Sequence, residues 1–377
     1  MSKDVLARET LTAAGLLRRR IHNHRLETSG FRDPADVVAW MGAVQAQDYP
    51  AAKWALGLRV PGLTDEDVER AFAEGRILRT HVLRPTWHFV APDDIRWMLE
   101  LTGPRVRRMN ANYYRRLGLD DALVARSRRV MERALRGGKQ LTRARIGTAL
   151  RRAGIAVDRR ALAHVAMDAE LNGVVCSGAR EGKQFTYALL EERAPRAKTL
   201  TKDEALAELT RRYFASHGPA TIRDYVWWSG LAVGDARRGI DIVGSGLQRS
   251  QLGDDTHWAA PARGAMPAPV GAHLLPNYDE YLIAYRDRGT VVGPARTPPV
   301  GPRGSDVFAH NLIIEGRLAG SWTRSHGSDG ARIDVASYRR PTPGDRRAIA
   351  AAADRYGKFM EQQVICVQGW PGRPSRP

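Results

Sequence analysis

The feature that most constrains the fold is one order of elements that recurs along the chain: helices followed by two short strands around a polar turn. The clearest copy covers residues 141–191, where apolar side chains recur at helical spacing between 159 and 171. Residues 174–190 then form two β-rich runs around a turn rich in glycine and charge, which predicts a hairpin. A basic helix lies upstream, and three helices followed by a hairpin are typical of a winged-helix unit.

Two further segments follow the same order. The second copy, residues 202–260, has three helical patterns and then two strands around a Gly-Asp-Asp turn. The third copy is looser and lies nearer the N-terminus, with helices predicted over 33–47 and 63–76 and an alternating hairpin pattern over 76–91. Similar order at three places favours a tandem array of units.

We therefore predict an α+β fold with three tandem winged-helix units. Residues 10–125 form the first unit, with a Gln-x-Gln motif and the start of a basic bridge; residues 126–195 form the second and 196–365 the third. The third unit carries a β-rich C-terminal extension. Its predicted elements are strands within 273–285, 311–322 and 331–338 and a closing helix over 342–360.

Positive charge is concentrated in one part of the chain. Lys and Arg total 59 against 41 Asp and Glu, which gives a net charge of +18 and a pI near 10.5. Residues 105–152 hold fifteen basic and three acidic side chains, a concentration that an even genomic bias toward arginine does not produce. A basic surface attracts polyanions, so we expect contact with nucleic acid; a merely solvated basic face is the alternative.

Several classes of protein lack support in the sequence. No apolar run approaches the ~20 residues of a membrane span, and the N-terminal residues mix charges of both signs, unlike a secretory signal. The two cysteines, Cys176 and Cys366, make neither a disulfide framework nor a CxxC zinc motif. Walker A, HExxH and GxSxG motifs are absent. We expect a soluble cytoplasmic protein with no metal, no cofactor and no membrane association.

The segment Val44–Pro50 holds Gln45 and Gln47 on either side of Ala46. On a continuous helix, residues two apart point in different directions, whereas near a helix end or in an extended turn they can share a face. A glutamine carboxamide stays neutral and can orient a water molecule, but it is a poor base. Such a pair suits only a reaction whose leaving group departs readily. Capping or surface roles are the alternative.

Other polar positions have a structural and a functional interpretation. Asp48 is either a turn-forming residue or a carboxylate of the same site. His81 and His88 flank Arg84 and Trp87. These four side chains either line a nucleotide pocket, through stacking and phosphate contacts, or belong to a hairpin whose histidines are internally satisfied.

The paired acids Asp279 and Glu280 lie in a segment that we predict to be a strand. Neighbouring strand residues face opposite ways, so the two are not an acid/base pair, and a structural role is favoured. Trp227 and Trp228 are expected in the core rather than against a base.

Three segments together resemble one family. They are residues 45–59 (QAQDYPAAKWALGLR), 79–90 (RTHVLRPTWHFV) and 274–288 (LLPNYDEYLIAYRDR). In this order they are similar to segments of the AlkZ-type DNA glycosylases, members of the winged-helix family that also contains YcaQ. The resemblance spans roughly residues 10–365. It implies three tandem winged helices around a concave DNA-binding channel.

The resemblance also implies a reaction. Members hydrolyse the N-glycosidic bond of N7-alkylated purines, and some unhook interstrand crosslinks made by alkylating natural products, which protects the producing organism. Their catalytic motif, Q-Φ-Q or Q-Φ-D, falls here on Gln45 and Gln47. Asp48, His88 and Asp279 are the candidate supporting residues. With no lysine nucleophile evident, we expect a monofunctional enzyme that leaves an abasic site.

The expected partner is double-stranded DNA carrying N7-alkylguanine or crosslink lesions, bound by a monomer. The predicted DNA contacts are Arg84, Trp87, Arg105, Arg107, Arg108, Arg115, Arg116, Arg143 and Arg145. Two other interpretations remain at this point. A non-enzymatic winged-helix transcription regulator would bind one undamaged sequence, and a drug-sequestering protein would bind the alkylating agent itself.

Overall fold

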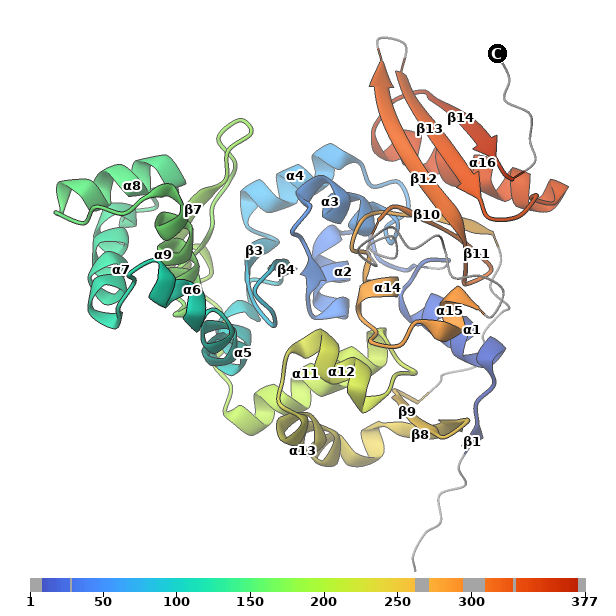
Figure 1. Ribbon diagram of the computed structural model, residues 1–377, viewed down its shortest axis with the longest axis horizontal. Helices are drawn as coiled ribbons and strands as arrows, with labels where there is room; N and C mark the ends of the chain where they lie inside the picture. The colour runs from blue at the N-terminus through green and yellow to red at the C-terminus, as the bar shows by residue number, and fades with distance from the viewer. Residues whose placement is uncertain (1–8, 28, 262–270, 294–308, 328–329, 372–377) are drawn as a thin grey trace, which may run out of the picture.

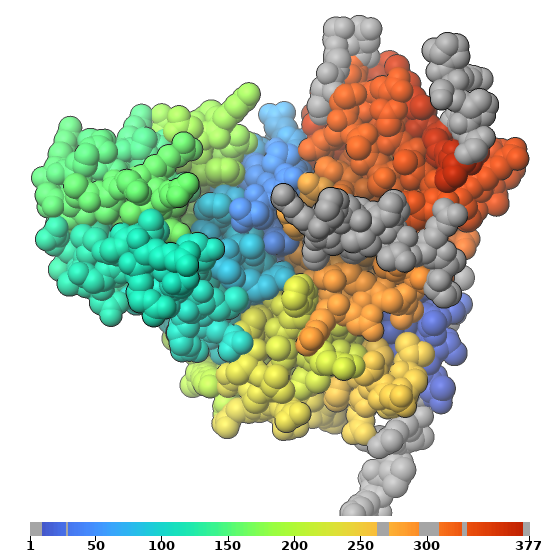
Figure 2. All heavy atoms as spheres, viewed as in Figure 1, coloured from blue at the N-terminus to red at the C-terminus, as the bar shows by residue number. Residues whose placement is uncertain are grey.

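The computed structural model describes residues 9–27, 29–261, 271–293, 309–327 and 330–371. This part of the chain is an α+β protein in which helices pack with four separate sheets, three of three strands and one of five. In Figure 1 the second helix–hairpin unit lies at one side and the five-stranded sheet at the other, with the first and third units between them. In the space-filling view, the first unit lies at the bottom of a depression between these two flanks (Figure 2). No helix in the described ranges is long and apolar enough to cross a membrane.

The first unit contains the predicted hairpin and two predicted helices, together with a strand and a helix that the sequence pattern did not indicate. Its elements are α2 (Pro34–Met41), β2 (Val44–Gln45), α3 (Tyr49–Gly57), α4 (Asp65–Glu74), β3 (Leu78–His81) and β4 (Trp87–Val90). Asp33 caps α2 ahead of Pro34, and Thr64 forms a capping box at the start of α4. The helix predicted over 33–47 ends early because Gly42 has a φ of 80°. The Gln-x-Gln motif therefore lies outside the helix.

The basic stretch forms helices that connect the first unit to the second. α5 (Ile95–Met109) and α6 (Ala111–Arg116) follow the first hairpin and precede α7 (Asp121–Leu135), which Asp120 caps. The rest of the second unit consists of β5 (Leu141–Thr142), α8 (Arg143–Arg152), α9 (Arg159–Leu171), β6 (Val175–Ser177) and β7 (Thr186–Leu189). The strands have the order β5-β7-β6, and one hydrophobic cluster runs from Tyr114 to Leu189. The helices and hairpin predicted for this copy are confirmed.

The third unit also has the predicted three helices and hairpin. After the short α10 (Leu190–Arg193) come α11 (Lys202–Ser216), α12 (Ile222–Ser229), α13 (Val233–Val243), η1 (Gly244–Gly246), β8 (Gln248–Leu252) and β9 (Asp255–Ala259). Thr201 and Thr221 form capping boxes at α11 and α12. Near the N-terminus, β1 (Glu9–Thr10) pairs parallel with β8, and α1 (Ala13–Asn23) follows it.

The C-terminal region is a five-stranded sheet with a long helix, and it shares a hydrophobic core with the first unit. Its elements are β10 (Ala272–Leu275), α14 (Glu280–Ile283), α15 (Gly289–Val292), β11 (Asn311–Ile314), β12 (Arg317–Gly327), β13 (Gly330–Ser337), α16 (Pro343–Phe359) and β14 (Val364–Gly369), with the strands in numerical order. The Trp54 ring of α3 lies 5.1 Å from the rings of both Tyr356 and Phe359. These contacts join the two ends of the chain.

One sequence prediction in this region is wrong. The strand expected within 273–285 ends at Leu275, and Asp279 instead caps the helical turn that begins at Glu280. An aspartate before an apolar run favours a helix start, because its carboxylate accepts a free backbone N–H, here that of Tyr281 at 2.9 Å.

Candidate active site

The segment with the two glutamines is extended and lies between an edge strand and a helix. Gln45 is the last residue of β2 and pairs with His88 of β4. The Ala46 N–H donates to the Trp87 carbonyl at 2.7 Å, and the Ala46 carbonyl accepts from Arg79 Nε at 3.0 Å. Side chains alternate along extended backbone. Ala46 is buried and Gln45, the end of β2, is half-buried. Gln47 lies at the bend that follows β2 and is exposed, and its Oε1 accepts from the Trp87 N–H at 3.4 Å.

A buried carboxylate holds this segment from behind. β2 is an edge strand, so the Gln45 N–H has no strand partner; it donates to Glu280 Oε1 at 2.8 Å. The other carboxylate oxygen of Glu280 accepts from Trp228 Nε1 at 3.0 Å and lies 3.7 Å from His217 Nε2. Glu280 is 1% exposed. Glu280, which was expected to have only a structural role, is therefore one of the residues that contact the Gln-x-Gln backbone.

The carboxylates of Asp48 and Asp279 both accept hydrogen bonds from other residues of the chain. One oxygen of Asp48 accepts from the Ala51 N–H at the start of α3, and the other accepts from Asn277 Nδ2 at 3.1 Å. The carboxylate of Asp279 is buried and accepts two hydrogen bonds from the guanidinium of Arg59, both of 2.9 Å. Asp48 thus touches the segment after β10, whereas Asp279 anchors that segment to α3.

The histidines of the first hairpin are buried. His88 Nδ1 lies 2.9 Å from the Thr86 carbonyl, and burial lowers the pKa of His88 well below its usual range, so the ring is neutral at pH 7. His81 contacts the Glu170 carboxylate of α9. The Trp87 ring lies 4.4 Å from the His81 ring. Burial also lowers the pKa of Arg84, which lies in the turn between β3 and β4.

A cavity of about 260 Å³ lies beside Gln47, between the hairpin of the first unit and that of the second. Its lining includes Gln47, Arg79, Trp87, Arg143, Glu170, Ser177, Phe185, Thr186 and Tyr187. Sequence analysis missed Arg79 and Phe185. Nothing in their local pattern marks them, because the contact between them joins strands about a hundred residues apart.

The predicted DNA-binding arginines other than Arg84 lie on the three helices α5, α6 and α8. Arg108, Arg115 and Arg116 of α5 and α6 are exposed and make no ion pair within the part of the chain that the structure describes. Arg107 pairs with Asp121 at 2.6 Å, and Arg145 of α8 pairs with Glu181 at 2.9 Å. The structure therefore distinguishes exposed arginines that form no ion pair with the described residues from arginines that pair with a carboxylate.

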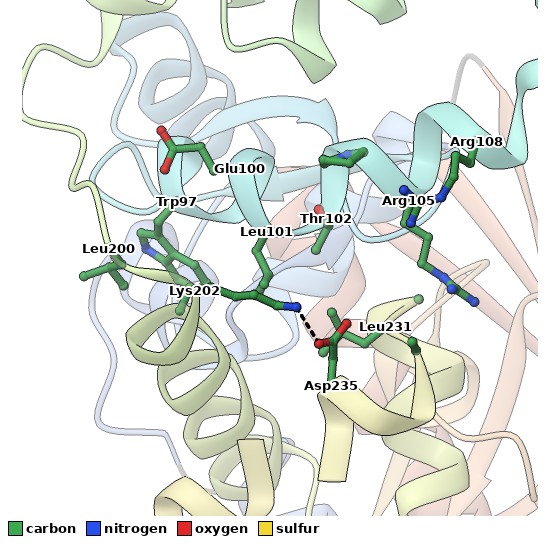
Figure 3. A pocket seen from close by; sticks show the side chains of 14 residues that line it. Trp97, Glu100, Leu101, Thr102, Arg105, Arg108, Leu200, Lys202, Leu231 and Asp235 are labelled. Carbon is green, nitrogen blue, oxygen red and sulfur yellow. Dashed lines mark ion pairs between the residues drawn. The ribbon is translucent and has the colours of Figure 1, made fainter. Parts of the chain in front are cut away.

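A second cavity, of about 340 Å³, lies between α5 and the third unit. Figure 3 shows Arg105 reaching from α5 toward the turn that carries Leu231, with the ion pair between Lys202 and Asp235 nearby. Arg108 also lines this cavity. The Gln-x-Gln segment does not line it, so the two cavities are distinct.

The site offers little to a metal ion. No cluster of three or more His, Cys, Asp or Glu side chains suited to a metal occurs among the residues described. The arrangement instead presents two neutral carboxamides on a backbone that Glu280 and Arg79 hold, and Asn277 contacts the neighbouring Asp48 carboxylate.

Comparisons with known proteins agree with this structure. A family model described as "DNA glycosylase AlkZ-like" matches residues 38–359. The chain is 24% identical over 332 residues to the "Interstrand DNA cross-link repair glycosylase" of Streptomyces sahachiroi, covering 80% of this chain and 85% of the relative. The solved structure of Streptomyces sahachiroi DNA glycosylase AlkZ matches with a TM-score of 0.76 at 20% identity, covering 95% of this chain and 100% of that one.

The matched family defines the class of enzyme, a DNA glycosylase, which cuts the bond between a base and its deoxyribose. The chain belongs to the AlkZ-like DNA glycosylase family. The resemblance predicted from three short segments is confirmed, and so is the α+β class.

Proposed function

We propose that this enzyme hydrolyses the N-glycosidic bond of cationic N7-alkylpurines in DNA, and that Gln45 and Gln47 orient the attacking water. The observation that carries the proposal is that both carboxamides are open to solvent, Gln45 half-buried and Gln47 exposed, on either side of the buried Ala46. The carboxylates nearest to them are already engaged: Asp48 by Asn277, and Glu280 by the Gln45 N–H. A site without a free base suits a substrate that needs little acid or base assistance.

The chemistry of N7-alkylpurines meets this requirement. Alkylation at N7 gives the purine a positive charge, so the base departs as a neutral molecule, taking the bonding electrons, without prior protonation. The oxygen of water adds to C1′, and its proton passes to solvent. The enzyme must hold that water opposite the departing base and tolerate an oxocarbenium-like transition state. Uncharged lesions and normal bases are therefore expected to be poor substrates.

The lysine nearest in sequence to the glutamine pair is not available as a nucleophile. Lys53 of α3 is buried, and its ammonium group pairs with Asp65 at 2.6 Å and Glu69 at 3.1 Å. Without an amine to form a Schiff base with the sugar, the enzyme releases the base and leaves an abasic site without cutting the strand.

In this proposal the three helix–hairpin units act as tandem winged helices around a concave DNA channel, and the monomeric enzyme works on cytoplasmic DNA. Exposed arginines of α5 and α6 contact phosphates without reading sequence. Crosslink unhooking is a further part of the proposal, supported by the similarity to the interstrand DNA cross-link repair glycosylase of Streptomyces sahachiroi. A base tied to the opposite strand resists full extrusion, so an open groove suits it better than a deep pocket.

The test is excision from a duplex that carries one N7-methyl-2′-deoxyguanosine, followed by alkali to cut the strand at any abasic site. Wild type is expected to release the base, and the Gln45→Ala/Gln47→Ala variant to lose at least ~100-fold in single-turnover rate, a typical loss when catalytic positioning is removed. Gln251→Ala, which changes a glutamine in the third unit, is the matched control.

Folding and duplex binding of each variant are measured by circular dichroism and anisotropy. Absence of cleavage by wild type at any enzyme excess would overturn the N7-alkylguanine proposal. A footprint on one undamaged sequence would favour the regulator instead. Full activity of the folded double variant would remove Gln45 and Gln47 from the mechanism.

A further inference from the structure

Arg79 of β3 is a buried cation without a carboxylate partner. Its side chain is almost fully buried, at 5% exposure, between the rings of Trp87 and Phe185, each 4.3 Å from the guanidinium carbon. Its Nε donates to the Ala46 carbonyl, and no carboxylate of the described residues lies within ion-pair distance. Burial lowers the pKa of Arg79 to about 10, so the guanidinium remains charged at pH 7.

Arg143 brings a second cation to the same cavity beside Gln47. Its Nη2 donates to the Tyr187 hydroxyl at 3.3 Å, and it forms no ion pair with any described carboxylate. The one carboxylate in the lining belongs to Glu170, which His81 already contacts. Burying a cation without a counter-charge is costly. Arg79, which is buried, and Arg143, which is half-buried, therefore suit an anion supplied from outside.

We propose that Arg79 and Arg143 form a subsite for one phosphodiester group of the damaged strand, in the cavity beside Gln47. This inference rests on the proposed function. A guanidinium donates two parallel hydrogen bonds to phosphate oxygens, and the rings of Trp87 and Phe185 fix the plane of the Arg79 fork. The same charges repel a cationic alkylated base, so the base lies elsewhere. Holding a phosphate here sets the distance from the sugar to Gln45 and Gln47.

The experiment replaces single phosphates of the substrate with neutral methylphosphonates. The duplex carries N7-methylguanine on a 2′-fluoroarabino sugar, which resists excision, and the linkages on both sides of the lesion are replaced one at a time. Binding is measured by anisotropy for wild type, Arg79→Met, Arg143→Met and Arg332→Met. Arg332, paired with Asp334 on the five-stranded sheet, is the matched control.

For wild type, one neutral linkage is expected to weaken binding roughly tenfold, the scale of a hydrogen bond to a charged group. In Arg79→Met the same linkage is expected to weaken binding much less than in wild type, because only Arg143 still contacts the phosphate, and the salt slope of binding should fall by about one. Arg332→Met should keep the full tenfold effect. This dependence of the linkage effect on Arg79 reports direct contact between Arg79 and the phosphate. Loss of the Arg79–Ala46 hydrogen bond alone would not produce it.

If every linkage weakens wild type and Arg79→Met equally, the subsite is wrong. The result does not depend on catalysis. A protein that couples Arg79 to one phosphate but never excises a base would refute the proposed function and leave the subsite standing. A protein that excises the base normally, but in which Arg79→Met does not alter the effect of any neutral linkage, would refute the subsite and leave the proposed function standing.

Discussion

A single carboxylate, that of Glu280, satisfies two buried donors from distant parts of the chain. It accepts from the Gln45 N–H and from Trp228 Nε1, which belong to the first and the third unit. Glu280 was predictable as structural, but its contact with the Gln-x-Gln segment was not, because the partners lie 235 residues apart. Gln45 and Gln47, in contrast, could be named only through the family resemblance, because the motif alone left a capping or surface role open.

The first prediction concerns this carboxylate. Glu280→Ala leaves two buried N–H groups without acceptors, at about 1–3 kcal/mol each, so the free energy of unfolding should fall by about 2 kcal/mol or more. Excision should slow at least ~10-fold, because the Gln45 backbone is no longer held. Glu280→Gln keeps one acceptor oxygen and should lie between the two in urea denaturation and in single-turnover excision. Equal behaviour of all three proteins would contradict the positioning role.

At the scale of elements, the sequence predicts a helix or strand well when neighbouring residues determine where it begins. The starts of α4, α11 and α12 are set by threonine capping boxes within four residues, and all three helices were predicted. β1 and β14 were not, because each forms by parallel pairing with a distant strand, β8 and β13. Two-residue β2 was missed for the same reason, since only β4 gives it a partner.

A glycine at the end of α12 tests how the third unit holds the first hairpin. Gly230 has a φ of 67°, and a Cβ there would lie 2.2 Å from the Leu83 carbonyl oxygen in the turn between β3 and β4. Gly230→Ala should therefore push the hairpin away and cost about 1–3 kcal/mol of unfolding free energy. Gly234→Ala in α13, where a Cβ meets nothing within 4 Å, is the matched control and should be neutral or slightly stabilising.

Urea denaturation measures the free energy of unfolding of the two glycine variants, and excision assays measure whether their activity changes. A Gly230→Ala protein as stable as Gly234→Ala would show that the hairpin turn moves without cost.

Over the whole molecule, the basic side chains behind the net charge of +18 do not contribute equally to the attraction of a polyanion. Arginines that pair with neighbouring carboxylates have part of their field cancelled, whereas Arg108, Arg115 and Arg116 are exposed and unpaired within the described residues. Composition alone predicted a polyanion partner but could not separate these two kinds of arginine, because pairing depends on the fold.

Changing Arg108, Arg115 and Arg116 together to Gln should weaken duplex binding and reduce the salt slope by about two to three, close to one per lost phosphate contact. The matched control changes Arg211, Arg332 and Arg339, each paired with a carboxylate, and removes the same charge. Anisotropy titrations at several salt concentrations distinguish the two. Equal slopes would mean that the basic bridge acts only through net charge.

Buried histidines make the stability of the molecule pH-dependent. Burial, with Arg355 and Arg59 nearby, lowers the pKa of His273 to about 3. Between about pH 6.5 and pH 3 the unfolded chain binds a proton that the folded chain does not, so the free energy of unfolding falls as pH falls, by about 1.4 kcal/mol per unit for this residue. His273→Gln should flatten that dependence in urea denaturation between pH 4.5 and 7. An unchanged slope would assign the effect to other groups.

The shared core of the two chain ends has a consequence for synthesis. A ribosome completes Gln45 and Gln47 early. Glu280, which accepts from the Gln45 N–H, Asn277, which contacts Asp48, and Tyr356, which packs on Trp54, emerge more than two hundred residues later. Nascent chains and C-terminally truncated fragments thus carry Gln45 and Gln47 on a strand edge that lacks the Glu280 contact. The enzyme becomes competent to cut a base from DNA only when nearly all of it has been made.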